Sequence, residues 1–129
     1  MLTVGISNEI NRTVTKENTA AALGSGMLEV FATPAMVALM EETCLKSVQP
    51  ELEEGSGTVG TGMSVHHLSA TPVGMNVRCI SKLVEVDGRK LVFDVQAFDE
   101  AGLIGQGMHE RFIIDNEKFM TKAAGKLDK

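Results

Sequence analysis

The sequence has no tryptophan and no tyrosine, and five phenylalanines are its only large aromatic residues. Proteins that bind single-stranded nucleic acid stack the bases on aromatic side chains interleaved with basic ones, and this sequence offers no such platform. A formal net charge of −5 also opposes association with a polyanion. We therefore expect no nucleic-acid partner, and a core built from aliphatic residues, methionine and phenylalanine.

Sequence signals for disulfides, membrane spans and metals are missing as well. Cys44 and Cys79 are isolated and form no CxxC pair, so two reduced thiols are expected. No apolar run approaches the roughly 20 residues of a transmembrane helix, and the N-terminus lacks the basic start and apolar stretch of a signal peptide. The acidic segment 51–57 matches no metal-ligand spacing. These absences predict a cytoplasmic protein with no membrane partner and no metal.

What is present centres on one helix, predicted over residues 33–48. Thr33 can accept the free N–H groups of a first helical turn, and the proline that follows suits the start of a helix. Glu41 falls inside the apolar stripe of this helix, whereas Glu42 lies about 100° further round. A buried or half-buried carboxylate is costly unless it has partners or a function, so Glu41 is a candidate site residue and Glu42 should be solvated. The stripe comprises Val37, Met40, Cys44 and Val48.

After the helix the apolar residues alternate with a period of two, which predicts strands joined by tight turns. An Asp-Gly pair at 87–88 is typical of a hairpin. Tight turns force antiparallel pairing, and one long helix can cover only one face of a sheet. We predict a single α+β domain over residues 1–129, in which a curved antiparallel sheet wraps around the long central helix. Its strands are expected within 3–15 and at 58–70, 75–86, 90–98 and 103–114, followed by a last helix within 116–127.

Two of these strands carry side chains that could do chemistry. Alternation along the first of them places His67 on the inward face with apolar residues and Gly60 on the opposite face. A hydrogen-bonded core histidine is the ordinary interpretation of such a position. In the last strand Arg111 and His109 share one face, and a surface ion pair is the ordinary interpretation for Arg111. The free N–H groups at the helix start, near Thr33, could hold an oxyanion or a phosphate.

Four segments of the chain resemble the hot-dog-fold thioesterases, and specifically their fluoroacetyl-CoA thioesterase-like branch. The resemblance covers nearly the whole chain in the same order. It implies the hot-dog fold, a homodimer or a dimer of dimers, and acyl-CoA sites near the dimer interface. The segments are residues 30–41 (VFATPAMVALME), 60–67 (GTGMSVHH), 70–74 (ATPVG) and 107–111 (GMHER).

By position, the resemblance marks Thr33, Glu41 and His67 as catalytic, with Gly60 lining the acyl site and Arg111 near it. His67 would act as general base or proton shuttle. Glu41 would orient His67, activate water, or attack the thioester carbonyl to give an anhydride. Thr33 would hydrogen-bond the reacting groups or act as the nucleophile. No metal is implied, and no cofactor beyond the coenzyme A of the substrate. Glu41 and His67 should then converge on one pocket.

The leading hypothesis is a cytoplasmic thioesterase that hydrolyses a short or medium acyl-CoA to the free acid and CoA. An alternative is a non-catalytic protein of the same fold that binds acyl-CoA or another small ligand. A hydratase of this fold would need an Asp or Asn and a His deep in the pocket, and no such pair stands out. The aromatic residues that precede the helix in the fluoroacetyl-specific enzyme are absent from residues 18–29, which leaves the acyl group open.

Overall fold

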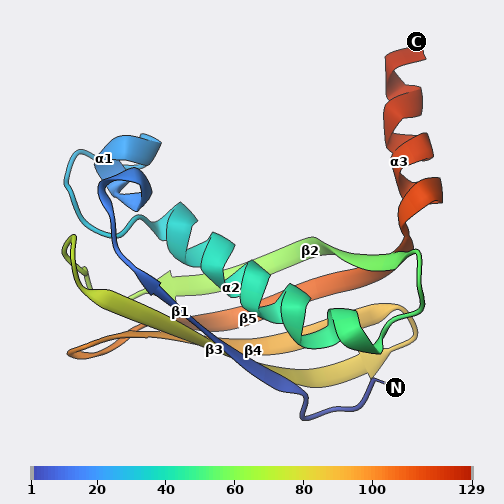
Figure 1. Ribbon diagram of the computed structural model, residues 1–129, viewed down its shortest axis with the longest axis horizontal. Helices are drawn as coiled ribbons and strands as arrows, with labels where there is room; N and C mark the ends of the chain where they lie inside the picture. Colours follow the sequence, from blue (N-terminus) through green and yellow to red (C-terminus); the bar gives the residue numbers. More distant parts are fainter. Residues whose placement is uncertain (1, 129) are drawn as a thin grey trace.

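The computed structural model describes residues 2–128, which form one five-stranded sheet with a long helix laid across it (Figure 1). All neighbouring strands are antiparallel, in the order β1-β3-β4-β5-β2, so β1 and β2 are the two edges. This arrangement confirms the predicted α+β architecture. The strands are β1 Ser7–Thr13, β2 Ser56–His67, β3 Asn76–Asp87, β4 Lys90–Asp99 and β5 Gly102–Asp115; the helices are α1 Ala20–Leu23, α2 Thr33–Val48 and α3 Asn116–Ala124, with 3-10 turns at Lys16–Asn18, Gln49–Glu51 and Gly125–Asp128.

Helix α2 has the predicted bounds, but its first residue behaves differently from the prediction. The capping position is Ala32, which offers no side-chain acceptor to the first turn. Thr33 is already helical, and its hydroxyl bonds to a side chain of β2 instead of capping the helix. The expectation that Thr33 would accept the free N–H groups of the first turn was therefore wrong.

The buried face of α2 is wider than the predicted stripe, because the helix packs mainly against β3 and β1 of a sheet that curves around it. Cys44 is a buried core thiol, as expected, while Val37 is only half-buried. Glu42 is half-buried rather than fully solvated, and its carboxylate pairs with Arg12 and Lys46, each at 2.6 Å. The buried residues of the helix are Met36, Leu39, Met40, Thr43, Cys44 and Val48.

Strands β3 and β4 show the predicted alternation most clearly. Their inward residues are fully buried beneath α2, and the hairpin between them turns at Gly88, whose φ is +62°. That φ lies in the left-handed region, where glycine avoids the strain of a β-carbon. The inward set is Val77, Cys79, Ser81 and Leu83 on β3, and Leu91, Phe93, Val95 and Ala97 on β4.

A bulge in β2 changes which of its residues face the helix. The pairing with β5 shifts between Gly60 and Gly62, so the residue between them, Thr61, is the extra one. Thr61 therefore points outward and donates a hydrogen bond to Glu110 Oε2 at 2.7 Å. The simple alternation that put Gly60 on the outward face was wrong, since Gly60 follows the buried Thr58 and faces α2. After the bulge, His67 faces inward as predicted.

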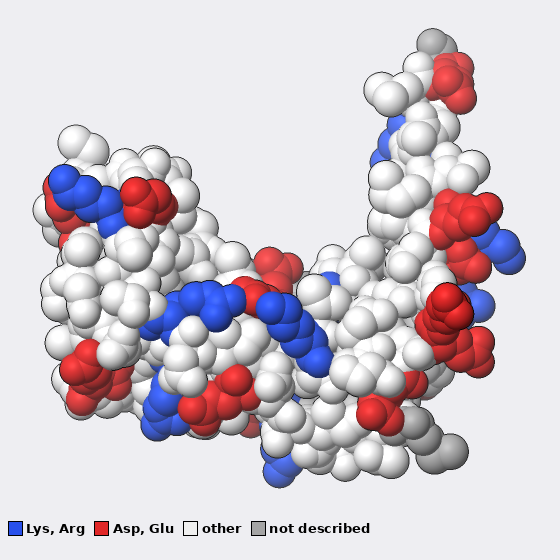
Figure 2. Space-filling model, viewed as in Figure 1, with Lys and Arg blue, Asp and Glu red and all other residues white. Residues whose placement is uncertain are grey.

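Two segments rise from the same side of the sheet at its two ends. The segment before α2 is tied down by backbone bridges, including a bond from Phe31 N to Thr71 O at 2.8 Å. At the other end α3 projects from the body and every one of its residues is exposed (Figure 1). Figure 2 shows the saddle between them, with acidic and basic side chains intermixed on this face. None of the helices within residues 2–128 is long and apolar enough to cross a membrane.

Candidate active site

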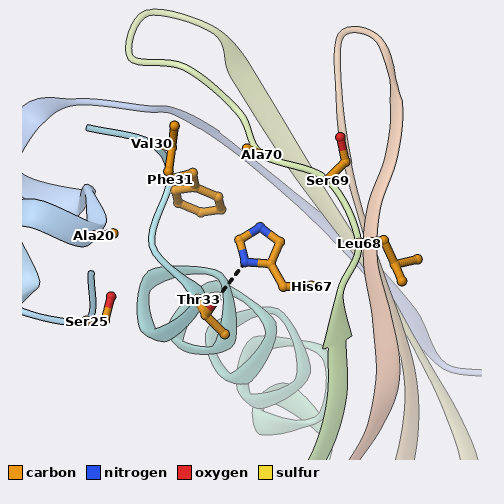
Figure 3. Close-up of a pocket in the computed structure, with 9 residues that line it drawn as sticks. All are labelled: Ala20, Ser25, Val30, Phe31, Thr33, His67, Leu68, Ser69 and Ala70. Carbon is orange, nitrogen blue, oxygen red and sulfur yellow. Dashed lines mark hydrogen bonds between the residues drawn. The ribbon is translucent and has the colours of Figure 1, made fainter. Parts of the chain in front are cut away.

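A hydrogen-bonded pair, Thr33 and His67, lies in a pocket at the start of α2. Thr33 Oγ1 and His67 Nδ1 are 2.7 Å apart, the one side chain from the first turn of the helix and the other from the last residue of β2 (Figure 3). The pocket has a volume of about 280 Å³, which suits a small ligand. Its wall also contains Ala20, Ser25, Val30, Phe31, Leu68, Ser69 and Ala70.

The surroundings of His67 favour a neutral imidazole near physiological pH. Burial lowers the pKa of its imidazole, and an interaction with the Ser69 backbone offsets part of that shift. Nδ1 is engaged by Thr33, while Nε2 is buried and has no hydrogen-bond partner among residues 2–128. A buried ring nitrogen without a partner is unfavourable in a purely structural histidine. This arrangement would allow a neutral His67 to act as a base, with one nitrogen oriented by Thr33 and the other facing the pocket.

Glu41 lies elsewhere, at the middle of α2 and against the bulge of β2. One of its carboxylate oxygens, Oε2, is 2.8 Å from the point that a β-carbon on Gly60 would occupy. Only glycine leaves room for the carboxylate there. Glu41 is half-buried, and no hydrogen bond or ion pair joins it to any other described residue of the chain. A half-buried carboxylate carries a desolvation cost, which the nearby charge of Arg111, rather than a hydrogen bond, offsets here.

Arg111 is buried beside Glu41 and is held by three hydrogen bonds. Its Nε donates to Thr58 Oγ1 at 2.7 Å, and Nη2 donates to the Thr58 carbonyl at 2.9 Å. Its Nη1 bonds to His109 Nε2 at 3.1 Å and lies 3.5 Å from the β-carbon position of Gly60. Burial lowers the pKa of Arg111, whereas the nearby Glu41 carboxylate raises it. The surface ion pair considered for Arg111 was therefore wrong.

The predicted site residues thus form two groups within one chain. Thr33 and His67 make the first, and Glu41, Gly60 and Arg111 make the second. Gly60 precedes His67 by seven residues on β2, which corresponds to roughly 20 Å at 3.3 Å per residue. Glu41 follows Thr33 by eight residues on α2, or about 12 Å at 1.5 Å per residue. The expected convergence of Glu41 and His67 on one pocket does not occur inside a single chain.

The hydrogen bonds that His109 makes to Arg111 and to the Gly62 carbonyl were not predicted from the sequence. Sequence reasoning noted that His109 and Arg111 share a face, and the structure buries both of them. Their contact through Nη1 and Nε2 could have been anticipated from the His-x-Arg spacing, because residues two apart on a strand are neighbours on one face. The bond from His109 Nδ1 to the Gly62 carbonyl at 2.8 Å depends on the bulge and carries no local sequence signal.

Comparisons with known proteins identify the family that the chain resembles. A family model described as fluoroacetyl-CoA-specific thioesterase matches residues 14–117. The fluoroacetyl-CoA thioesterase of Streptantibioticus cattleyicolor is 46% identical over 98 residues, which cover 76% of this chain and 70% of that protein. A solved structure of the fluoroacetyl-CoA-specific thioesterase superposes with a TM-score of 0.93 at 38% identity, covering 98% of both chains. A mutant of that enzyme solved with fluoroacetate and CoA has a TM-score of 0.87 and 39% identity, over 92% of this chain and 99% of that one. The predicted hot-dog fold is confirmed.

Proposed function

Since this chain belongs to the fluoroacetyl-CoA-specific thioesterase family, we propose that it hydrolyses short acyl-CoA thioesters at a site that two copies of the chain build together. The chain is a thioester hydrolase, and its substrates are acyl-CoAs. The catalytic role of each residue and the assembly of two chains around one site are what we propose. The observation that carries it is the separation of two incomplete groups, Thr33 with His67 and Glu41 with Arg111, along helix α2 and the edge strand β2 that lies beside it.

The edge strand β2 offers a way to join the two groups. Its outer side presents unpaired backbone groups, which an antiparallel strand of a second chain can cover. If the pairing is centred on Ser64 and Thr61 remains the extra residue of the bulge, Gly60 of the partner subunit lies opposite His67. The partner's Glu41 then approaches the Thr33–His67 pocket from the neighbouring helix. A two-fold dimer built this way contains two complete sites.

Within this composite site each side chain has a role that suits its surroundings. The pair of Thr33 and His67 handles protons, with Thr33 fixing the ring. In one route the Glu41 carboxylate of the other subunit orients a water molecule, His67 takes the proton of that water as it attacks the thioester carbonyl, and the proton then passes to the departing CoA sulfur. In the other route Glu41 bonds to the carbonyl carbon and expels CoA as the thiolate, which leaves an anhydride that a water deprotonated by His67 hydrolyses. First-turn N–H groups of α2, which no side chain caps, can stabilise the oxyanion.

The pocket favours a small acyl group. Much of its wall consists of Ala20, Ser25 and Ala70, and Phe31 supplies an aromatic surface from a position next to the helix rather than from residues 18–29. This support points to acyl groups of a few carbons. The solved relatives bind fluoroacetate and CoA, or acetyl-CoA, which are ligands of that size. The chemistry needs no metal or cofactor beyond the coenzyme A of the substrate, because acid, base and carboxylate groups suffice for thioester hydrolysis.

We place the enzyme in the cytoplasm, which is where acyl-CoA is made and used and where two buried free thiols such as Cys44 and Cys79 stay reduced.

Release of free CoA thiol from a panel of acyl-CoAs tests the proposal. The parent protein should prefer short acyl chains, and Glu41→Gln should lower turnover at least about a hundredfold, the lower end of the range for a positioned acid or base group. Glu42→Gln is the matched control, because the adjacent carboxylate faces Arg12 and Lys46 instead of the site. Equal turnover of parent and Glu41→Gln would contradict the assignment.

A further inference from the structure

His109 is a buried, fully engaged histidine that has no place in the mechanism above. Its side chain is 1% exposed and lies beside the ring of Phe93, with the two ring centroids 6.3 Å apart. Nδ1 is 2.8 Å from the Gly62 carbonyl, and Nε2 is 3.1 Å from Arg111 Nη1. Both ring nitrogens therefore have partners, in contrast to those of His67.

The two partners fix the protonation state of the ring. A carbonyl oxygen can only accept, so Nδ1 carries the proton that it donates to Gly62. A guanidinium can only donate, so Nε2 must be bare to accept from Arg111. A second proton on the ring would place two N–H groups against each other. Burial also lowers the pKa of His109, which keeps the ring neutral.

We infer that His109 is a positioning residue for the hydrolytic reaction, which joins Arg111 to the β2 bulge so that the guanidinium and Gly60 together shape the place of the Glu41 carboxylate. The nearest atoms to the β-carbon position of Gly60 are Glu41 Oε2 at 2.8 Å, His109 Cε1 at 3.3 Å and Arg111 Nη1 at 3.5 Å. On its other side Arg111 donates to Thr58, through Nε and Nη2. Among residues 2–128, His109 supplies the one hydrogen-bond acceptor of Nη1, the nitrogen of Arg111 that lies over Gly60.

This role predicts which step of the reaction suffers when His109 is changed. Glu41 is the group that drives the attack in the proposed function, on which this inference rests. A shifted guanidinium would move the carboxylate by a fraction of an ångström, and displacement of a reacting group by about 1 Å can cost about a hundredfold in rate. The small acyl pocket around Thr33 and His67 would be untouched. The loss should therefore appear in kcat, with KM almost unchanged.

Two conservative variants separate positioning from packing. His109→Asn keeps a donor close to the place of Nδ1 and so can still bond to Gly62, but it has nothing at the place of Nε2. His109→Gln reaches that place with its side-chain oxygen and can accept from Arg111. We expect His109→Asn to lower kcat by about tenfold or more, within the range of a lost orienting contact, and His109→Gln to recover most of it. His66→Asn is the matched control, because His66 is an exposed histidine on the outward face of β2.

A double-mutant cycle on kcat gives the decisive result. In an Arg111→Lys background, His109→Asn should have little further effect, because the contact that it removes is already lost. Parental kcat in His109→Asn, equal losses of kcat in the Asn and Gln variants, or independent multiplication of the His109 and Arg111 effects would each overturn the inference.

Thermal unfolding of every variant, measured alongside, identifies a loss of kcat that comes from misfolding. If His109→Asn misfolds, the comparison of His109→Gln with the parent then decides the test. Glu41→Gln run in the same assay distinguishes the two levels. If it keeps parental turnover, the proposed function fails and this inference with it; if it is inactive while His109→Asn is fully active, only the positioning role fails.

Discussion

The two halves of the candidate site differ in how completely they are satisfied. At the start of α2, Thr33 is exposed and His67 is half-buried; one of its ring nitrogens is bonded to Thr33 and the other has no hydrogen-bond partner in the described part of the chain. At the middle of α2, the guanidinium of Arg111 is buried and makes three hydrogen bonds. Beside it the Glu41 carboxylate feels the charge of Arg111 but forms no hydrogen bond or close ion pair with any residue between 2 and 128. Each half thus contains a group held by hydrogen bonds and, within those residues, a polar atom without a hydrogen bond.

The difference shows what folding of a single chain can and cannot provide. The Arg111 half is completed by the sheet itself, since β2 and β5 are paired neighbours and supply Thr58, Gly60 and His109. The His67 half lies at the end of the same edge strand, beyond which residues 2–128 supply no further strand. In the proposed dimer, the carboxylate of this half is Glu41 of the second copy.

The largest effect on turnover should come from the half at the start of α2, which contains Thr33 and His67. Replacing His67 by Ala removes the proposed base, and turnover should fall at least about a hundredfold. His66→Ala changes the neighbouring histidine, whose side chain is exposed on the other face of β2, and should leave turnover near the parental value. Steady-state thiol release on one short acyl-CoA compares the two variants. Comparable losses in both would mean that the strand end, rather than the His67 imidazole, matters.

A methyl group at Gly60 tests the other half of the site, which contains Glu41 and Arg111. Gly60→Ala would place a β-carbon 2.8 Å from Glu41 Oε2 and push the carboxylate away, so kcat should fall by about tenfold to a hundredfold. Unfolding stability should fall only modestly, because the end of the Glu41 side chain can move away, while the buried His109 ring, with Cε1 at 3.3 Å, has to shift slightly. The control is Gly62→Ala, where the nearest atom is the Glu110 β-carbon at 3.6 Å. Full activity of Gly60→Ala would show that the carboxylate does not need its present place.

A substitution at Thr58 tests how much the hydrogen bonds of Arg111 contribute to the free energy of unfolding. Thr58→Val keeps the shape of the side chain but removes the acceptor of Arg111 Nε, which leaves a buried charged donor without a partner. The free energy of unfolding should fall by about 1–3 kcal/mol. Thr61→Val, which removes an exposed hydroxyl from the bulge of the same strand, should change it by no more than about 0.5 kcal/mol. Urea unfolding measures both, and equal effects would argue against a tightly held guanidinium.

Acidification should affect both halves in the same direction, although modestly. Burial lowers the pKa of His67 and of His109, so the unfolded chain binds protons at a higher pH than the folded chain does. Stability should therefore be fully present above about pH 6.5, the value for an unfolded histidine, and decline as the pH falls through and below it. The rate should likewise be flat near neutrality and fall on the acid side, since a protonated His67 cannot act as a base. Urea midpoints at pH 7 and pH 5 measure the first effect, and stability that rises on acidification would reverse the assigned shifts.

Much of this fold could be predicted because its elements follow local rules. The Asp-Gly turn, the alternation of β3 and β4 and the bounds of α2 each depend on residues close together in the sequence. The face of Gly60 could not, because a single bulged residue, Thr61, reverses the parity of everything before it. The Thr33–His67 hydrogen bond could have been predicted, because the resemblance marked both residues as site residues. The separation of Glu41 from His67 could not be predicted, since it depends on how far α2 and β2 extend past one another.

The most direct test of the composite site is complementation between two inactive variants. Because His67 and Glu41 of one chain would serve different sites of a two-fold dimer, a mixed dimer of His67→Ala and Glu41→Gln contains one intact site. Co-expression of the two should restore about a quarter of the parental turnover, since random pairing makes half of the dimers mixed and each has one of two sites. A mixture of His67→Ala with Thr33→Ala, which alter the same half, should stay inactive. If isolated mixed dimers of His67→Ala and Glu41→Gln are as inactive as either variant alone, the two-chain site is contradicted.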